Sequence, residues 1–277
     1  LLNDCLRHKI NVYNAKLVSD FDSELNTVKS LKKYTINELM FRDTISIDNP
    51  SVIDMFRKKT ILVTGGAGSI GSEIVKQIAE FKPKRIVVLD QAETPLNSIQ
   101  LKIAAAFPNI TCEFELVDIT NFQEIEMIFE KYSPDIVFHA AAYKHVPLLE
   151  SNFMQAVKVN IFGTKNLCEI SIKNNIDLIL ISTDKAAKPT SILGYTKRVS
   201  EQLIEFYNKS NINNNIFNIV RFGNVFGSSG SAITKFIDQI NNNEPVSITD
   251  KRATRFFMTI LEACYLVLET TSVKIKK

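Results

Sequence analysis

Cysteine and histidine are scarce in this chain, and their positions are scattered. The 277 residues include four cysteines and three histidines: Cys5, Cys112, Cys168, Cys264, His8, His139 and His145. No two cysteines form a C-x-x-C pair, and no histidine stands at ligand spacing from an acid or a cysteine. The pattern excludes a disulfide framework and a structural zinc site. We therefore expect free thiols in a reducing compartment and no bound metal.

Long apolar runs and an excess of one charge are also absent. No stretch approaches the about 18 apolar residues of a membrane span, and no secretory signal peptide opens the chain. The net charge of +3 is too near balance to indicate a nucleic-acid partner. Because the first residue is Leu rather than Met, we expect a fragment. It would be cytoplasmic, with membrane contact only through a segment absent from the chain, on the cytoplasmic face of the inner membrane in the intact protein.

A glycine-rich turn between an apolar run and an amphipathic stretch is the most informative segment. Residues 60–64 predict a strand, residues 72–80 predict a helix, and the turn between them has the sequence GGAGSIG. Its members Gly65, Ala67, Gly68, Ser69, Ile70 and Gly71 are candidate cofactor-binding residues. Glycines allow the backbone to approach a pyrophosphate, which the helix N-terminus attracts. Asp90 ends the next predicted strand 19 residues after Gly71, close to the about 20 expected for a carboxylate that holds the adenosine ribose. The alternative is a turn that serves packing only.

Strand-like and helix-like segments alternate from about residue 60 onward. The expected strands are 60–64, 85–90, 112–117, 135–139, 177–183 and 216–221, and the expected helices between them are 72–80, 93–105, 121–131, 152–174 and 191–209. This alternation predicts an α/β fold with a doubly wound parallel sheet of the Rossmann type.

The ends of the chain do not follow this alternation. We expect residues 1–35 to be the tail of a preceding domain and residues 36–58 to be a connector, with short helices at 36–40 and 50–57. Residues 59–277 would form the catalytic domain, including a small, truncated substrate-binding part at about 222–277 that contains a helix at 260–269.

Small and polar residues follow the predicted strands at the edge where a doubly wound sheet binds its ligand. The fourth strand leads into Ala140, Ala141, Ala142, Tyr143 and Lys144; the fifth ends in Thr183, Asp184 and Lys185; and the sixth is followed by Asn224 and Ser231. An adjacent acid and base suit paired proton transfer. Alternatively, Asp184 and Lys185 form only a solvated ion pair, and His139 is a packed strand-end histidine rather than a catalyst.

Several segments together resemble a known family. They are TGGAGSIG at 64–71, HAAAYKHVP at 139–147, STDKA at 182–186, GYTKR at 194–198, RFGNVFGSSGS at 221–231 and TRFFMT at 254–259. They resemble the nucleotide-sugar 4,6-dehydratases, which are extended short-chain dehydrogenase/reductases. The likeness is greatest to the large CapD-like polysaccharide biosynthesis enzymes, which act on UDP-N-acetylglucosamine. It covers about residues 37 to 270, and NELMFR at 37–42 resembles the connector of the large membrane-anchored members.

The resemblance implies an NAD-dependent hydro-lyase that makes a 4-keto-6-deoxy UDP-sugar for bacterial capsule, lipopolysaccharide O-antigen or other glycans. By similarity, Asp184 is the acid for the departing 6-hydroxyl, and Lys185 in its neutral form is the base at C5. Thr183 hydrogen-bonds O4, and Lys197 holds the nicotinamide ribose. A UDP-sugar 4-epimerase and a non-catalytic nucleotide-sensing or scaffold domain are the alternatives. We also expect a homo-oligomer.

The remaining site residues bind the cofactor or the nucleotide sugar. Asp118, Ile119, Asn160 and the 140–142 alanines are expected at the cofactor together with Lys144, and Lys144, Thr183, Asn224, Ser231 and Arg255 at the substrate. Arg255 is the candidate for the diphosphate, with Arg252 or Lys251 as alternatives. Asp90, followed by Gln91 without a nearby arginine, favours NAD over NADP.

One position departs from the wider superfamily, whose members use a Tyr-x-x-x-Lys pair. Leu193 stands four residues before Lys197, and Tyr195 is expected on the opposite helix face. Large subgroup members commonly carry methionine at this position, so a nonpolar residue does not by itself remove activity. The base at O4 therefore stays open between Lys185, a water and a substrate group.

Overall fold

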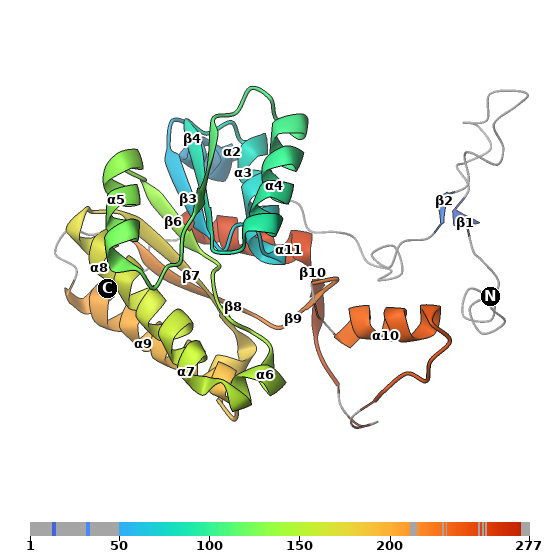
Figure 1. Cartoon of the computed structure of the whole chain (residues 1–277). Coiled ribbons are helices and arrows are strands. Elements are labelled where there is room, and N and C mark those ends of the chain that lie inside the picture. Colours follow the sequence, from blue (N-terminus) through green and yellow to red (C-terminus); the bar gives the residue numbers. More distant parts are fainter. Residues whose placement is uncertain are drawn as a thin grey trace, which may run out of the picture. The chain divides into compact units, whose positions relative to one another are not determined.

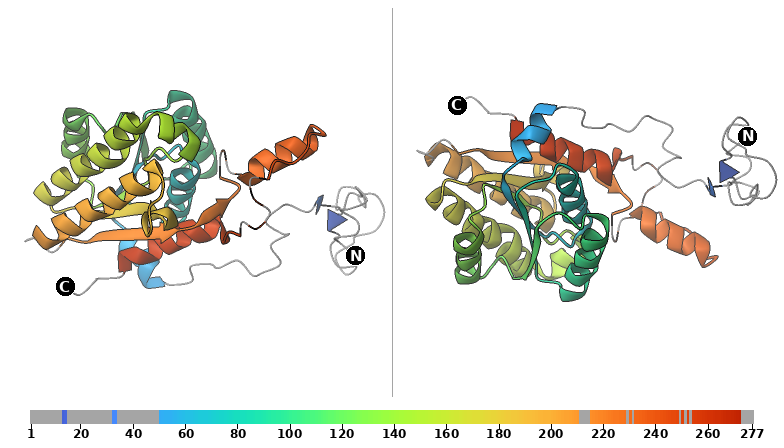
Figure 2. Two further views of the ribbon diagram at one scale, coloured as in Figure 1. Left: turned by 90° about the horizontal axis from the view of Figure 1, so that it is seen from below. Right: turned by 90° about the horizontal axis from the view of Figure 1, so that it is seen from above.

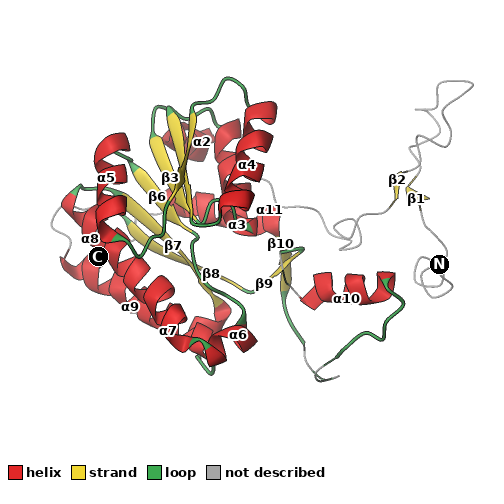
Figure 3. Ribbon diagram, in the orientation of Figure 1, coloured by secondary structure: helices red, strands yellow, loops and turns green. Residues whose placement is uncertain are grey.

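Six short apolar segments form one parallel sheet in the computed structural model. They are β3 (Thr60–Thr64), β4 (Arg85–Asp90), β5 (Cys112–Leu116), β6 (Ile136–His139), β7 (Asp177–Thr183) and β8 (Phe217–Phe222). Their order across the sheet is β5-β4-β3-β6-β7-β8 (Figures 1 and 3). This is the strand order of dinucleotide-binding doubly wound folds, with the switch point between β3 and β6. The predicted fold class is confirmed.

Helices cover both faces of this sheet. Those that contribute to the two cores are α2 (Pro50–Phe56), α3 (Ser69–Glu80), α4 (Glu93–Ala106), α5 (Phe122–Tyr132), α8 (Thr164–Lys173), α9 (Ile192–Ser210) and α11 (Ile260–Glu269). Successive strand residues face opposite cores: Ile61 and Val63 pack with α2, α3, α4 and α11, whereas Leu62 packs with α5, α8 and α9. Figure 2 shows α2 and α11 on the same side of the sheet.

The segment expected as one helix over residues 152–174 is divided. Helix α6 (Val146–Ser151) precedes α7 (Phe153–Ala156), and a π-helical stretch, η3 (Val157–Gly163), separates α7 from α8. The carbonyl oxygen of Asn160 accepts hydrogen bonds from the hydroxyls of Thr164 and Ser200, both at 2.6 Å. Side-chain donors that bind a helix carbonyl disturb the regular ladder, and π-helical turns often lie at functional sites.

After β8, the chain forms a short strand and a helix and then a second short strand that pairs with the first. Strand β9 (Asn224–Phe226) leads to α10 (Ala232–Asn241), and strand β10 (Phe257–Thr259) then pairs parallel with β9. Thr259 caps α11 reciprocally with Glu262, and Cys264 of α11 lies in the core against α3. After α11 the short 3-10 helix η5 (Thr270–Ser272) follows. Part of the range expected to bind substrate, 222–277, is therefore a covering layer of the sheet.

The structure describes residues 13–14, 32–33, 50–210, 215–228, 230, 232–248, 250, 252 and 254–272. The chain divides into two units, Leu1–Thr44 and Ile45–Lys277. In the first unit, β1 (Tyr13–Asn14) and β2 (Lys32–Lys33) pair antiparallel. In the second, Phe56 of α2 is fully buried in the core, so the end of the expected connector belongs to this second unit.

The helix expected at 36–40, the candidates Ser231 and Lys251, and most of the expected tail 1–35 lie outside the described residues. Among the described helices, none combines the length and apolar character needed to cross a bilayer.

Candidate functional site

The glycine turn is shaped by close backbone contacts. Gly65 has a φ of +63°, and a Cβ built on it would stand 2.5 Å from the backbone nitrogen of Ala141. A Cβ on Gly71 would stand 2.2 Å from the carbonyl oxygen of Gly65. Helix α3 begins at Ser69, three residues earlier than expected, with Gly68 as its N-cap. The glycines therefore serve packing, and the same packing brings a helix N-terminus to the switch point, where it suits an anion.

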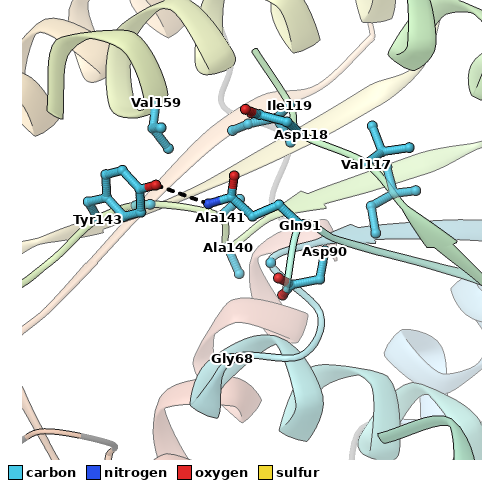
Figure 4. Close-up of a pocket in the computed structure, with 13 residues that line it drawn as sticks. Gly68, Asp90, Gln91, Val117, Asp118, Ile119, Ala140, Ala141, Tyr143 and Val159 are labelled. Atoms are coloured by element: carbon cyan, nitrogen blue, oxygen red, sulfur yellow. Dashed lines mark hydrogen bonds between the residues drawn. The ribbon is translucent and has the colours of Figure 1, made fainter. Parts of the chain in front are cut away.

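A small cavity of about 150 Å³ opens beside this turn. Figure 4 shows Gly68, Asp90, Asp118, Ile119, Ala140 and Ala141 around it, so six of the expected cofactor residues line one cavity. The carboxylate of Asp90 accepts the backbone N–H of Ala67 through Oδ2 and that of Ala92 through Oδ1, each at 3.0 Å. Each oxygen keeps a further lone pair for a ribose hydroxyl. The carboxylate of Asp118 accepts the N–H of Thr120 at 2.9 Å.

A side-chain bridge crosses the same cavity. Gln91 Nε2 donates to the hydroxyl of Tyr143 at 3.2 Å (Figure 4). Gln91 follows β4 and Tyr143 follows β6, and these strands flank β3, so the bridge spans the strand that ends in the glycine turn. Asn160 of η3 holds the far end in place: its Oδ1 accepts the Tyr143 N–H at 2.9 Å, and its Nδ2 donates to the Tyr143 carbonyl at 3.1 Å.

The expected cofactor residue Asn160 thus reaches the cavity only through Tyr143. Its side chain is buried, and Nδ2 also donates to the hydroxyl of Thr196 on α9 at 3.1 Å. Asn160 does not line the cavity, so its contacts fit a positioning role.

His139 is a packed histidine, as one of the alternatives predicted. Its ring is fully buried between Thr64 and Thr164, at 2.8 Å from Nδ1 and 2.9 Å from Nε2. The Thr164 hydroxyl donates to the Asn160 carbonyl, so Nε2 carries the proton and donates to Thr164. Burial, together with the nearby Lys197 charge, lowers the pKa of His139 to about 3, which keeps the ring neutral.

A larger cavity of about 460 Å³ continues from the first, and both are lined by Ala140 and Ala142. Its cationic lining residues are Lys144, Lys185, Lys197 and Arg255, and Ile70, Thr183, Leu193 and Asn224 also line it. Burial lowers the pKa of Lys144. Arg252, the alternative to Arg255, is instead paired with Asp250 at 3.0 Å. The cation-rich lining suits an anionic ligand.

Of the adjacent acid and base, Lys185 lines this larger cavity, whereas Asp184 lines a neighbouring cavity that shares Lys185 and Arg255 with it. Lys185 Nζ donates to Asp184 Oδ1 at 3.0 Å and to Asn224 Oδ1 at 3.3 Å, and the Thr183 hydroxyl donates to Asp184 Oδ1 at 2.9 Å. Partial burial alone would raise the pKa of Asp184, but the hydrogen bonds from Lys185 and Thr183 outweigh it and hold the pKa below its ordinary value. The pair is half exposed and has the geometry of an ion pair, and Lys185 lines both cavities.

Lys197 lies deep in the same cavity. It is 6% exposed, and its ammonium donates to the carbonyl of Ile181 at 2.8 Å. Burial lowers its pKa to about 8, against the opposing effect of the Glu201 charge. Leu193 is buried beside it, whereas Tyr195 is 54% exposed, as the helical spacing predicted.

Two site features were not predicted. The Gln91–Tyr143 bridge joins residues 52 positions apart, and no local pattern marks it. Glu201 is fully buried behind Ser182 and follows Lys197 by four residues, a helical spacing that could have identified it. Among the described residues, no group of three or more His, Cys, Asp or Glu side chains is arranged to hold a metal ion.

Two relatives of this chain are named as proteins of polysaccharide biosynthesis or nucleotide-sugar dehydration. It is 39% identical to the capsular polysaccharide biosynthesis protein CapD of Staphylococcus aureus, over 96% of this chain and 44% of CapD. It is 35% identical to a UDP-N-acetylglucosamine 4,6-dehydratase (inverting) of Campylobacter jejuni, over 77% of this chain and 64% of that protein. The chain thus spans less than half the length of CapD.

Solved structures agree with the fold. Pen from Bacillus thuringiensis superposes with a TM-score of 0.75 and 34% identity, over 79% of this chain and 67% of Pen. UDP-glucuronic acid 4-epimerase from Bacillus cereus, in complex with UDP-glucuronic acid and NAD, superposes with a TM-score of 0.68 and 26% identity, over 78% of this chain and 74% of the epimerase. The family of polysaccharide biosynthesis proteins matches residues 61–277. The resemblance seen in the motifs is therefore confirmed: this chain belongs to the polysaccharide biosynthesis protein family and is CapD-like.

Proposed function

We propose that this chain removes water from a UDP-N-acetylhexosamine, UDP-N-acetylglucosamine in the first place, to give the 4-keto-6-deoxy sugar. The observation that carries the proposal is the Asp184–Lys185 pair, joined at 3.0 Å. Its Lys185 lines the cation-lined cavity that shares Ala140 and Ala142 with the glycine-turn cavity, and its Asp184 lines a neighbouring cavity that also contains Lys185. An epimerase needs the hydride step but no acid and base for elimination. The dehydratase relative supports the same choice.

NAD is the cofactor that the smaller cavity fits. The carboxylates of Asp90 and Asp118 line it, and its described lining residues include no lysine or arginine to bind a 2′-phosphate. The NAD-bound epimerase neighbour agrees with a nicotinamide cofactor. We expect the chain to bind NAD more tightly than NADP, and a calorimetric titration with each nucleotide measures the difference. Equal affinities would contradict this assignment.

The chemistry requires four proton transfers and one returned hydride. When bound, the nicotinamide would supply the hydride chemistry, as acceptor of the C4 hydride and its donor to C6 in the same turnover. The O4 proton leaves as the ketone forms, the C5 proton leaves next, and the 6-hydroxyl departs as water after taking a proton. C5 then regains a proton as C6 receives the hydride, so the sum is loss of one water.

The pair is arranged to handle the elimination. Lys185 in its neutral form takes the C5 proton, and Asp184 in its protonated form gives a proton to the departing hydroxyl. The direct hydrogen bond between them allows one proton to shift from the ammonium to the carboxylate. A sugar that covers the pair excludes water, which favours the uncharged forms of both groups. Thr183 donates a hydrogen bond to Asp184. It also lines the larger cavity, where its hydroxyl can contact O4 of the sugar.

The test is incubation of the purified chain with UDP-N-acetylglucosamine, without added cofactor, and detection of the product by mass and NMR. We expect a 4-keto-6-deoxy product from the parent and none from the double variant Asp184→Asn, Lys185→Ala. The matched control is Glu126→Gln, Lys173→Ala, which removes an exposed ion pair of 2.7 Å on outer helices and should retain parental activity.

Other outcomes of that test would decide against the proposal. Parental turnover by the Asp184, Lys185 double variant would contradict the assigned roles, and formation of the C4 epimer would favour the epimerase. Stabilisation of the fold by NAD without any product would favour the nucleotide-sensing alternative.

We also propose that the chain forms a homo-oligomer. Large apolar side chains are exposed along α6, α7, η3 and α9: Leu148, Phe153, Met154, Phe162, Tyr195 and Phe206. Exposed apolar surface of this extent is typical of an interaction site. Light scattering coupled to gel filtration measures the mass, and a monomer at micromolar concentration would contradict the proposal.

A further inference from the structure

A buried carboxylate lies directly behind the proposed acid and base. Glu201 of α9 has no solvent exposure, and its carboxylate accepts four hydrogen bonds from three side chains. Burial alone would raise the pKa of Glu201, but the donors on Arg221, Ser182 and Arg198 outweigh it and hold the pKa below the ordinary value. Glu201 is therefore ionised in a place where an unpaired charge would be very unfavourable.

The donors come from the ends of two neighbouring strands. The Ser182 hydroxyl at the end of β7 donates to Oε1 at 2.6 Å, and Arg221 near the end of β8 donates to Oε1 through Nε at 2.7 Å and to Oε2 through Nη2. Ser182 and Arg221 are also register partners across the two strands. The Glu201 carboxylate thus binds two side chains that lie opposite each other on neighbouring strands, Ser182 and Arg221.

Ser182 and Arg221 each stand a few positions before a residue that is expected to contact the substrate. Ser182 is two positions before Asp184, and Arg221 is three positions before Asn224. The two segments meet where Lys185 Nζ donates to Asn224 Oδ1 at 3.3 Å. A separation of β7 from β8 at their ends would move this contact, and misplacement by about 1 Å can lower a rate about 100-fold.

We propose that Glu201 is a positioning residue that holds the ends of β7 and β8 together beneath the Asp184, Lys185 and Asn224 cluster. The inference rests on the function proposed above. Glu201 does not contact the cavity; it acts through Ser182 and Arg221.

Glu201 also acts electrically on Lys197, one helical turn before it. Its negative charge raises the pKa of Lys197 against the lowering effect of burial. The other titratable groups around Lys197 are the neutral ring of His139 and, in the same cavity, Lys144, His145, Lys185 and Arg255. Removal of the Glu201 charge therefore lowers the pKa of Lys197 below about 8.

Two variants separate position from charge. Ser182→Ala keeps the Glu201 charge and removes one strand contact, and Glu201→Gln keeps the shape and removes the charge. We expect both to lower kcat about 10- to 100-fold with KM for the UDP-sugar changed less than about twofold. Glu205→Gln is the matched control, because Glu205 is exposed on the same helix and pairs only loosely with Arg198, at 3.7 Å. It should retain parental kcat.

The second measurement is the dissociation constant for NAD between about pH 6 and pH 10. We expect an inflection near pH 8 in the parent and in Ser182→Ala, and a lower one in Glu201→Gln. A merely structural role would lower the melting temperature without this shift. If Glu201→Gln does not fold, the kcat of Ser182→Ala decides.

An unchanged kcat in Ser182→Ala, or an NAD inflection that is absent or unmoved in folded Glu201→Gln, overturns the inference. If the parent binds NAD but makes no 4-keto product, the proposed reaction fails while the NAD profile still tests Glu201. If it makes the C4 epimer, the same kcat comparison is carried out on epimerisation.

Discussion

Replacement of Lys197 by methionine should make the protein more stable and less able to hold its cofactor. Burial lowers the pKa of Lys197 from 10.5 to about 8. At about 1.4 kcal/mol for each tenfold change, this corresponds to about 3 kcal/mol of lost stability at neutral pH. Methionine has a similar length and no charge, but it leaves the Ile181 carbonyl without its donor, which costs about 1 kcal/mol. The net expectation near pH 7 is a gain of about 2 kcal/mol.

The sign of this effect should change with pH. The folded-state pKa lies below the unfolded value, so the unfolded chain binds the proton more tightly, and the penalty is complete below about pH 8. The parent therefore becomes more stable as the pH rises from about 8 to 10.5, and the advantage of Lys197→Met disappears over this range. Urea denaturation of both proteins near pH 7 and near pH 10 measures it.

A matched substitution separates this effect from a general gain in hydrophobicity. Lys188→Met replaces an exposed lysine and should leave the free energy of unfolding unchanged within about 0.5 kcal/mol. Equal stability of Lys197→Met and parent at both pH values would refute the reasoning, and so would lower stability of the variant near pH 7. Calorimetry should also show weaker NAD binding by Lys197→Met, because methionine lacks the amine that is proposed to hold the nicotinamide ribose.

Three further outcomes test other parts of the structure. Tyr143→Phe removes the hydroxyl that completes the bridge over the smaller cavity, and stopped-flow displacement should show NAD leaving about two- to tenfold faster; an unchanged rate would mean that the bridge does not retain the cofactor. Gly194→Ala places a methyl group 2.7 Å from the Lys185 carbonyl, so the turn that carries the acid and base must move; kcat should fall at least about tenfold with little change in NAD affinity, and a parental kcat would contradict this. Thr259→Ala removes a reciprocal helix cap and should lower the free energy of unfolding by about 1 kcal/mol in urea, with NAD affinity unchanged; a loss below about 0.3 kcal/mol would show that the cap is replaced by water.

The sheet and the glycine turn could be predicted because their signals are local. A strand buried on both faces is a continuous apolar run, and its end is marked by the first polar residue, as at Asp90 and Ser182. The strand order of this fold then brings such ends to one edge. Positions as far apart as Gly65 and Lys185 could therefore be assigned to neighbouring cavities from the sequence alone.

The supporting contacts could not be predicted, because each depends on a register between separate elements. Asn160 looked like a cofactor ligand, but a π-helical turn directs its amide to the backbone of Tyr143. Glu201 was not singled out in the sequence, because the pairing of Ser182 with Arg221 creates its buried site. Hydrogen bonds of this kind follow from tertiary packing, which overrides local preference.

The parallel pairing of β9 with β10 has a consequence for how much change the segment between them can accept. Phe257 lies beside Asn224 and Thr259 beside Phe226, so the intervening segment, which contains α10, begins and ends at the same two-stranded sheet. A segment rooted in this way can be exchanged for another without disturbing the strands beneath. The length and sequence of this segment can therefore change while the six-stranded sheet keeps its structure.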